Sequence, residues 1–340
     1  MIKMKNLYAT LAVSLLMSLT ACGDASDGNA GQSQNVQASA PAADTPAKTD
    51  GSAVPSAEQK VIRIAYLPIT HSLAGFEAAE LEKLKKDGLN IELVKFGSWT
   101  ELMDALNTGH VDAAVALVEL VMKAREQGVD VYLASLAHRD GNVIVVGNDI
   151  GSAADLKGKT FAIPHRQSSH FILLNEALAK ENVDINEINI VEMAPPEMPS
   201  ALATGQIAGY CVAEPFGAKA VSLNIGKVLY NSKDLWPDSI CCGFALSGKF
   251  LSAHPELASR LVKALKEGGL RLEHDHEHEK ELASKYFKVT NDTLDISLKW
   301  ISYDNLEIKK ENYDQLAEKV KKYGLSENPV PYEDIVRNVE

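Results

Sequence analysis

Titratable and hydrogen-bonding side chains gather in the loops that directly follow short apolar segments of this sequence. Histidine carries most of the information, because an imidazole can donate a hydrogen bond, accept one or bind a metal ion, and five of the nine histidines fall in loops. A loop that begins a helix also presents unpaired backbone N–H groups, which suit an oxyanion. We therefore predict that a small polar or anionic solute contacts these residues: Thr70, His71, Ser98, Trp99, Glu119, His138, Asn142, His165, Ser168, His170 and Glu214.

Several of these residues also have an ordinary structural interpretation. Ser98 and Ser168 are typical residues at the start of a helix, where the hydroxyl accepts a bond from a nearby backbone N–H. Glu214 suits the first turn of a helix, because the partial positive charge there favours an acid. Arg139 fits a surface ion pair. The sequence leaves both interpretations open.

Apolar strands and amphipathic helices alternate between these loops. Strands are predicted at residues 61–66, 91–96, 112–117 and 129–134, and helices at residues 72–86 and 98–107, with a third helix ending at 127. Such an alternation is typical of a parallel sheet with helices on both faces. Ligands of such sheets lie at the carboxyl ends of the strands, so the polar loops are placed where a site would form.

A second block of the same kind begins near residue 143. Its predicted strands cover residues 143–146, 161–163, 188–191 and 207–212, and helices are predicted at 168–180 and 196–204. Residues 255–320 are mostly helical and charged, which fits helices that pack back on the first block. The chain then crosses between blocks near Gly141 and near Gly243, so residues 60–142 and 243–340 form one lobe and residues 143–242 the other. Two α/β lobes joined by two crossings predict a clamshell that closes on its ligand.

The N-terminus has the features of an export signal followed by a lipid anchor. Lys3 and Lys5 precede an apolar run at residues 7–19, which is shorter than the ~20 residues of a membrane span. The run ends in Leu-Thr-Ala-Cys, and this order resembles the signal of bacterial lipoproteins, in which the cysteine, here Cys22, carries the lipid. Residues 1–21 are thus a predicted signal peptide, and residues 22–59, which are small and polar, a predicted disordered tether.

Net charge argues against a nucleic-acid partner. The formal charge is −12, and removal of residues 1–21 takes away two lysines and no acid, so the remaining chain carries −14. An acidic chain of this kind also lacks the electrostatic attraction to a membrane surface, although a pocket can still set its own local potential. We expect a monomer held at the membrane by its lipid.

Three cysteines lie beyond Cys22, namely Cys211, Cys241 and Cys242. Adjacent cysteines rarely bridge each other because of strain, so a bridge from Cys211 to one of the pair is possible but not indicated. Three buried thiols are the simpler interpretation.

A charged stretch at residues 273–279 holds three further histidines. His274 and His278 lie four positions apart, so on one helix they would share a face and could bind a metal ion. A solvated charged surface explains the stretch more simply, and we predict neither a cofactor nor a metal ion for the chain. Metal capture by this stretch remains an alternative function.

Four segments carry a resemblance to a known family. They read YLP at 66–68, NTGHVDA at 107–113, PPEM at 195–198 and GYCVAEPF at 209–216, and together they resemble the nitrate/sulfonate/taurine substrate-binding proteins of ABC importers. The resemblance implies a periplasmic-binding-protein fold of type II, which hands its solute to a membrane permease driven by an ATPase. It also implies that His170 touches an oxyanion and that Glu214 lies near the ligand, although Ala213 stands where the nitrate and bicarbonate binders have glycine.

The same family includes bicarbonate and pyrimidine-precursor binders, and related thiamine-pyrimidine synthases share the fold. Those enzymes carry a cysteine-rich run preceded by histidine, and residues 240–244, Ile-Cys-Cys-Gly-Phe, match it only weakly. No histidine lies within a few residues of these thiols to lower their pKa. We therefore expect a binding protein without catalytic activity, located outside the cytoplasm.

Overall fold

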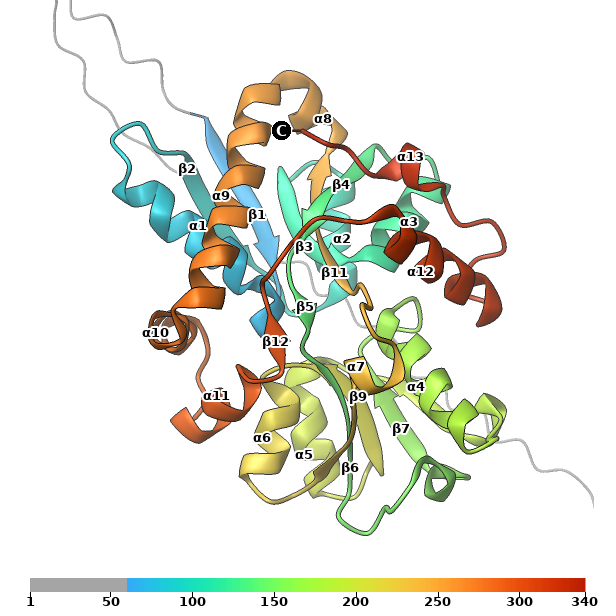
Figure 1. The fold of residues 1–340 in the computed structure, drawn as a ribbon. Helices are drawn as coiled ribbons and strands as arrows, with labels where there is room; N and C mark the ends of the chain where they lie inside the picture. The colour runs from blue at the N-terminus through green and yellow to red at the C-terminus, as the bar shows by residue number, and fades with distance from the viewer. Residues whose placement is uncertain (1–59, 340) are drawn as a thin grey trace, which may run out of the picture. The chain divides into compact units, whose positions relative to one another are not determined.

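Two five-stranded sheets form the core of the computed structural model, which describes residues 60–339. The first sheet has the order β2-β1-β3-β11-β4 and the second has the order β10-β6-β9-β7-β8. Figure 1 shows the first sheet in the upper half and the second in the lower half, with β5 and β12 between them. The strands are β1 (Val61–Tyr66), β2 (Asn90–Lys95), β3 (Ala113–Leu117), β4 (Val131–Leu136), β5 (Arg139–Asp140), β6 (Asn142–Val146), β7 (Thr160–Ile163), β8 (Asn189–Glu192), β9 (Gly209–Ala213), β10 (Lys227–Asn231), β11 (Cys242–Ser247) and β12 (Ile301–Ser302).

The two sheets have the same strand order, although the sequence shows no repeat. Strand β1 pairs in parallel with β2 and β3, and β7 pairs in parallel with β8 and β9. One strand of each sheet is antiparallel to both its neighbours: β11 between β3 and β4, and β6 between β9 and β10. The prediction of parallel strands was therefore wrong for β6 in the second sheet, whereas β11 in the first sheet was not predicted as a strand. Both exceptions are the strands that the chain enters directly after crossing from the other sheet.

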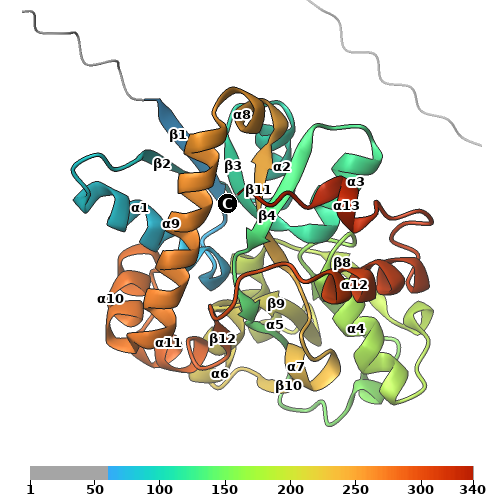
Figure 2. The same cartoon turned by 45° about the horizontal axis from the view of Figure 1, so that its top comes forward.

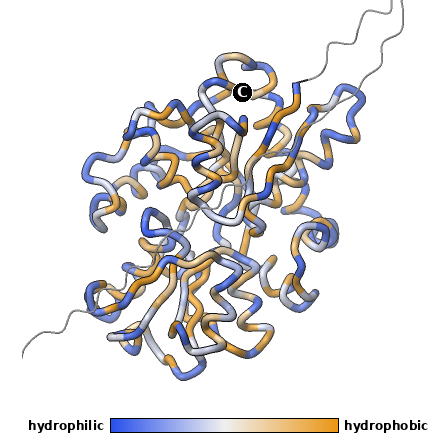
Figure 3. The backbone as a smooth tube through the Cα atoms, turned by 180° about the vertical axis from the view of Figure 1, so that it is seen from behind, coloured by the Kyte–Doolittle hydropathy of each residue, from blue (hydrophilic) through white to orange (hydrophobic). Residues whose placement is uncertain are grey.

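The central strands are buried on both faces, and their sequences show why. Strands β3, β6, β9 and β11 are buried at every residue, and such strands read as continuous apolar or small runs rather than alternating ones. Gly243 lets β11 approach β4, because a Cβ there would lie 2.8 Å from Leu133 Cδ2. Hydrophobic residues follow the strands of both sheets, and hydrophilic ones the outer turns (Figure 3).

Helices cover the sheets. Most helices up to α8 begin soon after a strand, as the alternating pattern predicted, whereas α9, α10 and α11 follow one another, and the α/β class is confirmed. None of the helices within residues 60–339 combines the length and apolarity of a membrane span. The helices are α1 (Leu73–Leu84), α2 (Trp99–Asn107), α3 (Val118–Glu126), α4 (Ser169–Lys180), α5 (Met198–Ala203), α6 (Phe216–Ser222), α7 (Ser232–Leu235), α8 (Gly248–Ala253), α9 (Pro255–His274), α10 (His276–Tyr286), α11 (Asn291–Ser297), α12 (Lys310–Lys322) and α13 (Tyr332–Ile335), with 3₁₀ turns η1 (Thr70–Ser72), η2 (Ala153–Leu156), η3 (Ile185–Glu187) and η4 (Pro195–Glu197).

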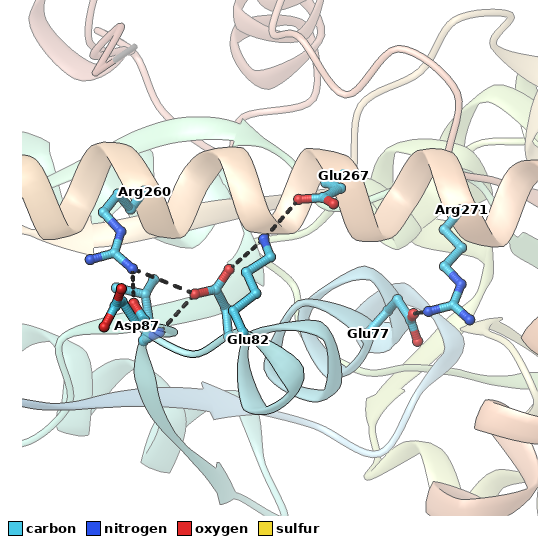
Figure 4. Close-up of polar contacts among 8 residues, drawn as sticks. Glu77, Glu82, Asp87, Arg260, Glu267 and Arg271 are labelled. Carbon is cyan, nitrogen blue, oxygen red and sulfur yellow. Dashed lines mark hydrogen bonds and ion pairs between the residues drawn. The ribbon is translucent and has the colours of Figure 1, made fainter.

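The long helix α9 packs on α1. Gly268 permits the close approach, because a Cβ there would lie 2.9 Å from the carbonyl oxygen of Ala74. Ion pairs join the two helices at both ends: Arg271 Nη1 lies 2.9 Å from Glu77 Oε1, and Arg260 contacts Glu82 and the end of α1 (Figure 4). Glu77 is fully buried, so its carboxylate depends on these partners.

The chain beyond α9 contacts both sheets' helices. Helix α10 lies against α1 and α9, whereas α11 packs against α6 of the second sheet. Helix α12 reaches α4 through Lys319, whose Nζ lies 2.7 Å from Glu176 Oε1, and Figure 2 shows these two helices side by side. The C-terminal region thus connects to both halves of the molecule.

His274 and His278 do not share a helix. Helix α9 ends at His274 and α10 begins at His276, because Asp275 leaves the helical conformation and caps α10 by accepting from His278 N. The single metal-binding face expected for these two histidines is therefore absent. His278 instead places Nε2 2.8 Å from Glu77 Oε2.

Candidate functional site

Two histidines from distant parts of the sequence stack at the centre of the molecule. His71 lies in η1, directly after β1, and His138 lies between β4 and β5. Their ring centroids are 3.5 Å apart at an angle of 21°, and both rings are buried. Burial, with a smaller contribution from His71, lowers the pKa of His138 to about 4. The ring of His138 is therefore neutral at pH 7 and can act as a ligand or an acceptor.

Two thiols lie against these rings. His71 Nδ1 is 3.4 Å from Cys242 Sγ and 3.9 Å from Cys241 Sγ, and the two sulfur atoms are 3.7 Å apart. The three cysteines of residues 60–339 are unbridged and buried. Within this part of the chain, His71, His138, Cys241 and Cys242 form a group that could hold a metal ion, with one ligand atom from each and all four atoms within 4.8 Å of one another.

Backbone contacts fix the orientation of both rings. His71 Nε2 lies 3.1 Å from the carbonyl oxygen of Gly141, which can only accept, so Nε2 carries a proton and Nδ1 faces the thiols. Cys242 N donates to His138 Nε2 over 3.3 Å. Gly141 has φ 76°, a conformation that favours glycine, and a Cβ there would lie 3.1 Å from His71 Nε2.

The two thiols differ in their acidity. Burial alone would raise the pKa of Cys241, but its polar contacts with Cys242, His138 and His71 outweigh burial and hold that pKa well below its ordinary value. Burial and the neighbouring Cys241 raise the pKa of Cys242. Cys241 is therefore the more acidic thiol of the pair.

Other buried polar groups also lack hydrogen-bond partners, and two of them, His170 and Glu119, lie near this cluster. His170, in the first turn of α4, has no hydrogen-bond partner on either ring nitrogen, and burial lowers its pKa to about 4, with the neighbouring His71 and His138 adding to the effect. Both carboxylate oxygens of Glu119, in the first turn of α3, also lack partners, and burial raises its pKa well above the ordinary range. Trp99 Nε1, Asn142 Oδ1 and Ser169 Oγ are buried and unpartnered as well. Buried polar atoms normally have partners, so this concentration indicates a place that a ligand or water completes.

Glu214 lies after β9 and joins Pro215 through a cis peptide bond. Its Oε2 accepts from Ala218 N over 2.9 Å, and Oε1 is unpartnered. Burial raises the pKa of Glu214 to about 8, so the side chain is protonated at neutral pH.

The remaining predicted residues lie in other surroundings. Ser98 and Ser168 cap α2 and α4 through bonds from Glu101 N and Phe171 N, which is their ordinary structural role. His165 is partly exposed, accepts from Gln167 N over 2.9 Å and lies 4.0 Å from Glu192 Oε1. Thr70 is buried and bonds to the Glu214 carbonyl oxygen. Arg139 donates to the carbonyl oxygens of Asp304 and Asn305, so it binds backbone rather than a surface acid.

Sequence reasoning missed Cys241 and Cys242. The argument that no histidine could lower the pKa of these thiols was wrong, because it considered only sequence neighbours. The histidines that contact them lie 171 and 104 positions away. One signal in the sequence could have indicated this site. It is the pair of adjacent cysteines at the start of β11, directly after the second crossing between lobes.

A model of the NMT1-like family matches residues 55–286, more than half of the 340 residues. The chain belongs to the NMT1-like family. This confirms the resemblance to the nitrate/sulfonate/taurine substrate-binding proteins.

Among solved structures, the ligand-binding component of an ABC-type import system from Staphylococcus aureus, with zinc bound, is 37% identical with a TM-score of 0.79, covering 82% of this chain and 97% of that one. The periplasmic nitrate-binding protein NrtA from Synechocystis PCC 6803 has a TM-score of 0.72 at 18% identity, covering 82% of this chain and 86% of that one. The two-lobed periplasmic-binding-protein fold of type II is thereby confirmed.

A curated relative is the nitrate import ATP-binding protein NrtC of Synechocystis, which is 28% identical over 60% of this chain. The NMT1-like chain spans about a third of that protein's length, at 34%. The chain likewise spans 40% and 35% of the length of two further relatives, the bicarbonate transport ATP-binding proteins CmpC of Synechocystis and Synechococcus elongatus.

Proposed function

We propose that this chain is the extracytoplasmic solute-binding component of an ABC importer. It captures a small solute between its two lobes and delivers the solute to a membrane permease driven by a cytoplasmic ATPase. Membership of the NMT1-like family supports this role, as does the name of the Staphylococcus aureus relative, which is a component of an import system.

The observation that carries the proposal is the set of unpartnered polar atoms that both lobes contribute. Glu119 and Trp99 come from helices beside the first sheet, and His170 comes from a helix beside the second. Each buried group without a partner costs about 1–3 kcal/mol, so a solute that bonds to them stabilises the arrangement in which both lobes meet. Such a ligand links binding to closure of the clamshell.

Location outside the cytoplasm follows from the predicted export signal and from the periplasmic relative NrtA. The predicted signal peptide, the lipid site Cys22 and the tether lie outside the described residues. We include the lipid anchor on Cys22 in the proposal, since it would hold the binding protein near its permease.

The identity of the solute has to be decided from the site itself. The names of the relatives give nitrate for one and zinc for another, which are an anion and a cation. No common ligand can be carried over from them to this chain.

Binding and closure can be measured together on the full chain. We expect native mass spectrometry of the gently purified protein to detect a retained, chemically unaltered ligand. Restoring that ligand to stripped protein should raise the melting temperature and reduce the radius of gyration in small-angle scattering. The same two quantities are then measured with nitrate, bicarbonate, taurine, an alkanesulfonate and Zn²⁺. If no ligand is retained and none of these compounds changes the melting temperature or the radius of gyration, the proposed function is overturned.

A further inference from the structure

The cluster of His71, His138, Cys241 and Cys242 has donor spacings close to those of a tetrahedral metal site. A zinc ion bound at ~2.3 Å by sulfur and ~2.0–2.1 Å by nitrogen places two sulfur ligands about 3.8 Å apart, and a sulfur and a nitrogen about 3.6 Å apart. The sulfur atoms of Cys241 and Cys242 are 3.7 Å apart. The distances from His71 Nδ1 to the two sulfur atoms are 3.4 and 3.9 Å, on either side of the ideal value.

The orientation of His71 is that of a metal-binding imidazole. Metal-bound histidines usually donate their other ring N–H to a carboxylate or a backbone carbonyl, which fixes the tautomer and directs the lone pair at the metal. His71 Nε2 makes this bond to the Gly141 carbonyl oxygen over 3.1 Å. Gly141 belongs to the first crossing between lobes, so the ring is held by the hinge segment itself.

Independent support comes from buried polar atoms that the protein leaves without partners around the cluster. His138 Nδ1 is fully buried and unpartnered, although it belongs to one of the four candidate ligands. His170, on the second lobe, is fully buried with both nitrogens unpartnered, and it lies close enough to Cys241 to respond to its charge. These atoms lack the partners that a purely structural role for the cluster would require.

The charges of the site suit a cation better than an oxyanion. The residues assembled here are imidazoles, thiols and the carboxyl groups of Glu119 and Glu214, and none of them is lysine or arginine. Two thiolates would neutralise a divalent ion, whereas an oxyanion would find neither a lysine nor an arginine among these residues. Thiolate and imidazole in a tetrahedral S₂N₂ set favour zinc over magnesium or calcium, which prefer oxygen ligands.

We propose that His71, His138, Cys241 and Cys242 bind one thiophilic transition metal ion, with Zn²⁺ as the best geometric match, and that this ion is the solute captured by the clamshell. The second part rests on the proposed function. The ligands come from the first lobe and from both crossings, and His170 approaches from the second lobe. Metal binding therefore involves each segment that moves when the lobes close.

A zinc competition assay on the full chain tests the site. The protein is purified in reducing buffer, stripped with a chelator, and titrated with Zn²⁺ against a chromophoric indicator. We expect one ion per chain, and loss of affinity by about a hundredfold or more in Cys241→Ser and in Cys242→Ser. Cys211→Ser is the matched control, because Cys211 is also a buried free thiol but lies outside the cluster, and it should bind as the unmodified protein does.

A spectroscopic measurement keeps the test independent of how the variants fold. Co²⁺ added to the stripped, unmodified protein should give a thiolate-to-cobalt charge-transfer band together with the intense visible bands of tetrahedral cobalt. A weak octahedral spectrum without charge transfer would overturn the assignment. So would Zn²⁺ affinity that is the same in Cys241→Ser, Cys242→Ser and Cys211→Ser.

Scattering with and without Zn²⁺ separates this inference from the proposed function. Binding at the four residues with compaction supports both. If Zn²⁺ binds there without compaction, and no other solute closes the lobes, the metal site stands and the importer role fails. If an oxyanion closes the lobes and Zn²⁺ does not bind, the importer role stands and the metal assignment fails.

Discussion

Thr70 donates two hydrogen bonds to one carbonyl oxygen, that of Glu214: its backbone N lies 2.8 Å from that oxygen and its Oγ1 lies 3.2 Å from it. Thr70 follows β1 of the first sheet, and Glu214 follows β9 of the second sheet, so these bonds join the two lobes directly beside His71. We expect them to form only while the lobes are together. Contacts of this kind set how easily the clamshell opens.

Thr70→Val should therefore weaken closure. Valine keeps the shape and the backbone bond but removes the Oγ1 bond, which is worth about 0.5–1.5 kcal/mol. We expect a fewfold to tenfold faster release of the bound ligand, measured by stopped-flow competition, with little change in the association rate. Thr204→Val, which removes a bond to Ser200 within one helix region of the second lobe, should leave release unchanged. Equal release rates in all three proteins would show that the Oγ1 bond does not resist opening.

His170→Ala should weaken ligand binding without destabilising the empty protein. Both nitrogens of His170 lack partners in the protein, so their loss removes no existing hydrogen bond. A lost bond to the ligand costs about 1.5–3 kcal/mol, or roughly tenfold to a hundredfold in affinity, which calorimetry can measure. The exposed His110→Ala is the control and should change neither property. Intact affinity, or a collapse of the melting temperature in the absence of ligand, would contradict a binding role for His170.

Glu214 should make the empty protein less stable as the pH rises. Its carboxyl ordinarily loses a proton near pH 4.5, whereas burial raises its pKa to about 8 in the folded protein. The folded state therefore holds a proton between these values that the unfolded state has lost. The stabilisation is fully present below about pH 4.5 and is lost as the pH rises through about 8.

Glu214→Gln, which cannot ionise, should lose less stability than the unmodified protein between pH 5 and pH 8.5, as followed by thermal unfolding in the presence of a chelator. Glu119, whose pKa is also raised by burial, contributes equally to both curves. The exposed Glu181→Gln should reproduce the curve of the unmodified protein. Parallel curves for Glu214→Gln and the unmodified protein would mean that Glu214 does not hold its proton in the folded state.

Glu77→Gln should destabilise the packing of α9 and α10 on α1. The buried Glu77 carboxylate lies 2.9 Å from Arg271 and 2.8 Å from His278, and the neutral amide loses both charge-assisted bonds. We expect a loss of about 1–3 kcal/mol in the free energy of unfolding, measured by urea denaturation. Glu92→Gln removes an ion pair with Arg63 that is half exposed on both sides, and it should cost less than about 0.5 kcal/mol. The ranking is the test, and equal losses would contradict it.

Cys22→Ser should release the protein from the membrane. In the proposal, the lipid on Cys22 holds the chain at the membrane. After fractionation and a high-salt wash, we expect the variant in the soluble fraction and the unmodified chain in the membrane fraction. A variant that remained in the membrane fraction would rule out the lipid on Cys22 as the anchor.

Local sequence patterns predicted most of the strands and helices but not how they are combined. The apolar runs at β3 and β7 were recognisable because burial on both faces requires them. The direction of β6 was not, since an antiparallel strand reads like a parallel one, and β11 was not predicted as a strand. The break at Asp275 was missed because helical periodicity continues across it, and only the capping bond to His278 N shows that a new helix begins.

The candidate site was predictable to a different degree for each residue type. Histidines stood out because they are few and lie in loops after strands, and the structure places His71, His138 and His170 around one centre. Their role as ligand contacts stays a prediction. The cysteines did not stand out, since Cys241 and Cys242 meet their histidine neighbours only through pairing of β11 with β3 and β4, and no local pattern encodes that pairing.

The shared strand order has a consequence for how the chain can fold as it is made. The second sheet draws all its strands from residues 142–231, whereas the first sheet has a gap between β3 and β4 until residues 242–247 arrive. The half that begins first in the sequence is thus completed last. A nascent chain that ends before Cys242 could assemble one entire sheet while β3 and β4 still lack the strand between them, and their exposed edges would be open to wrong pairing. Translation or export that pauses in this interval would leave the chain most prone to aggregate.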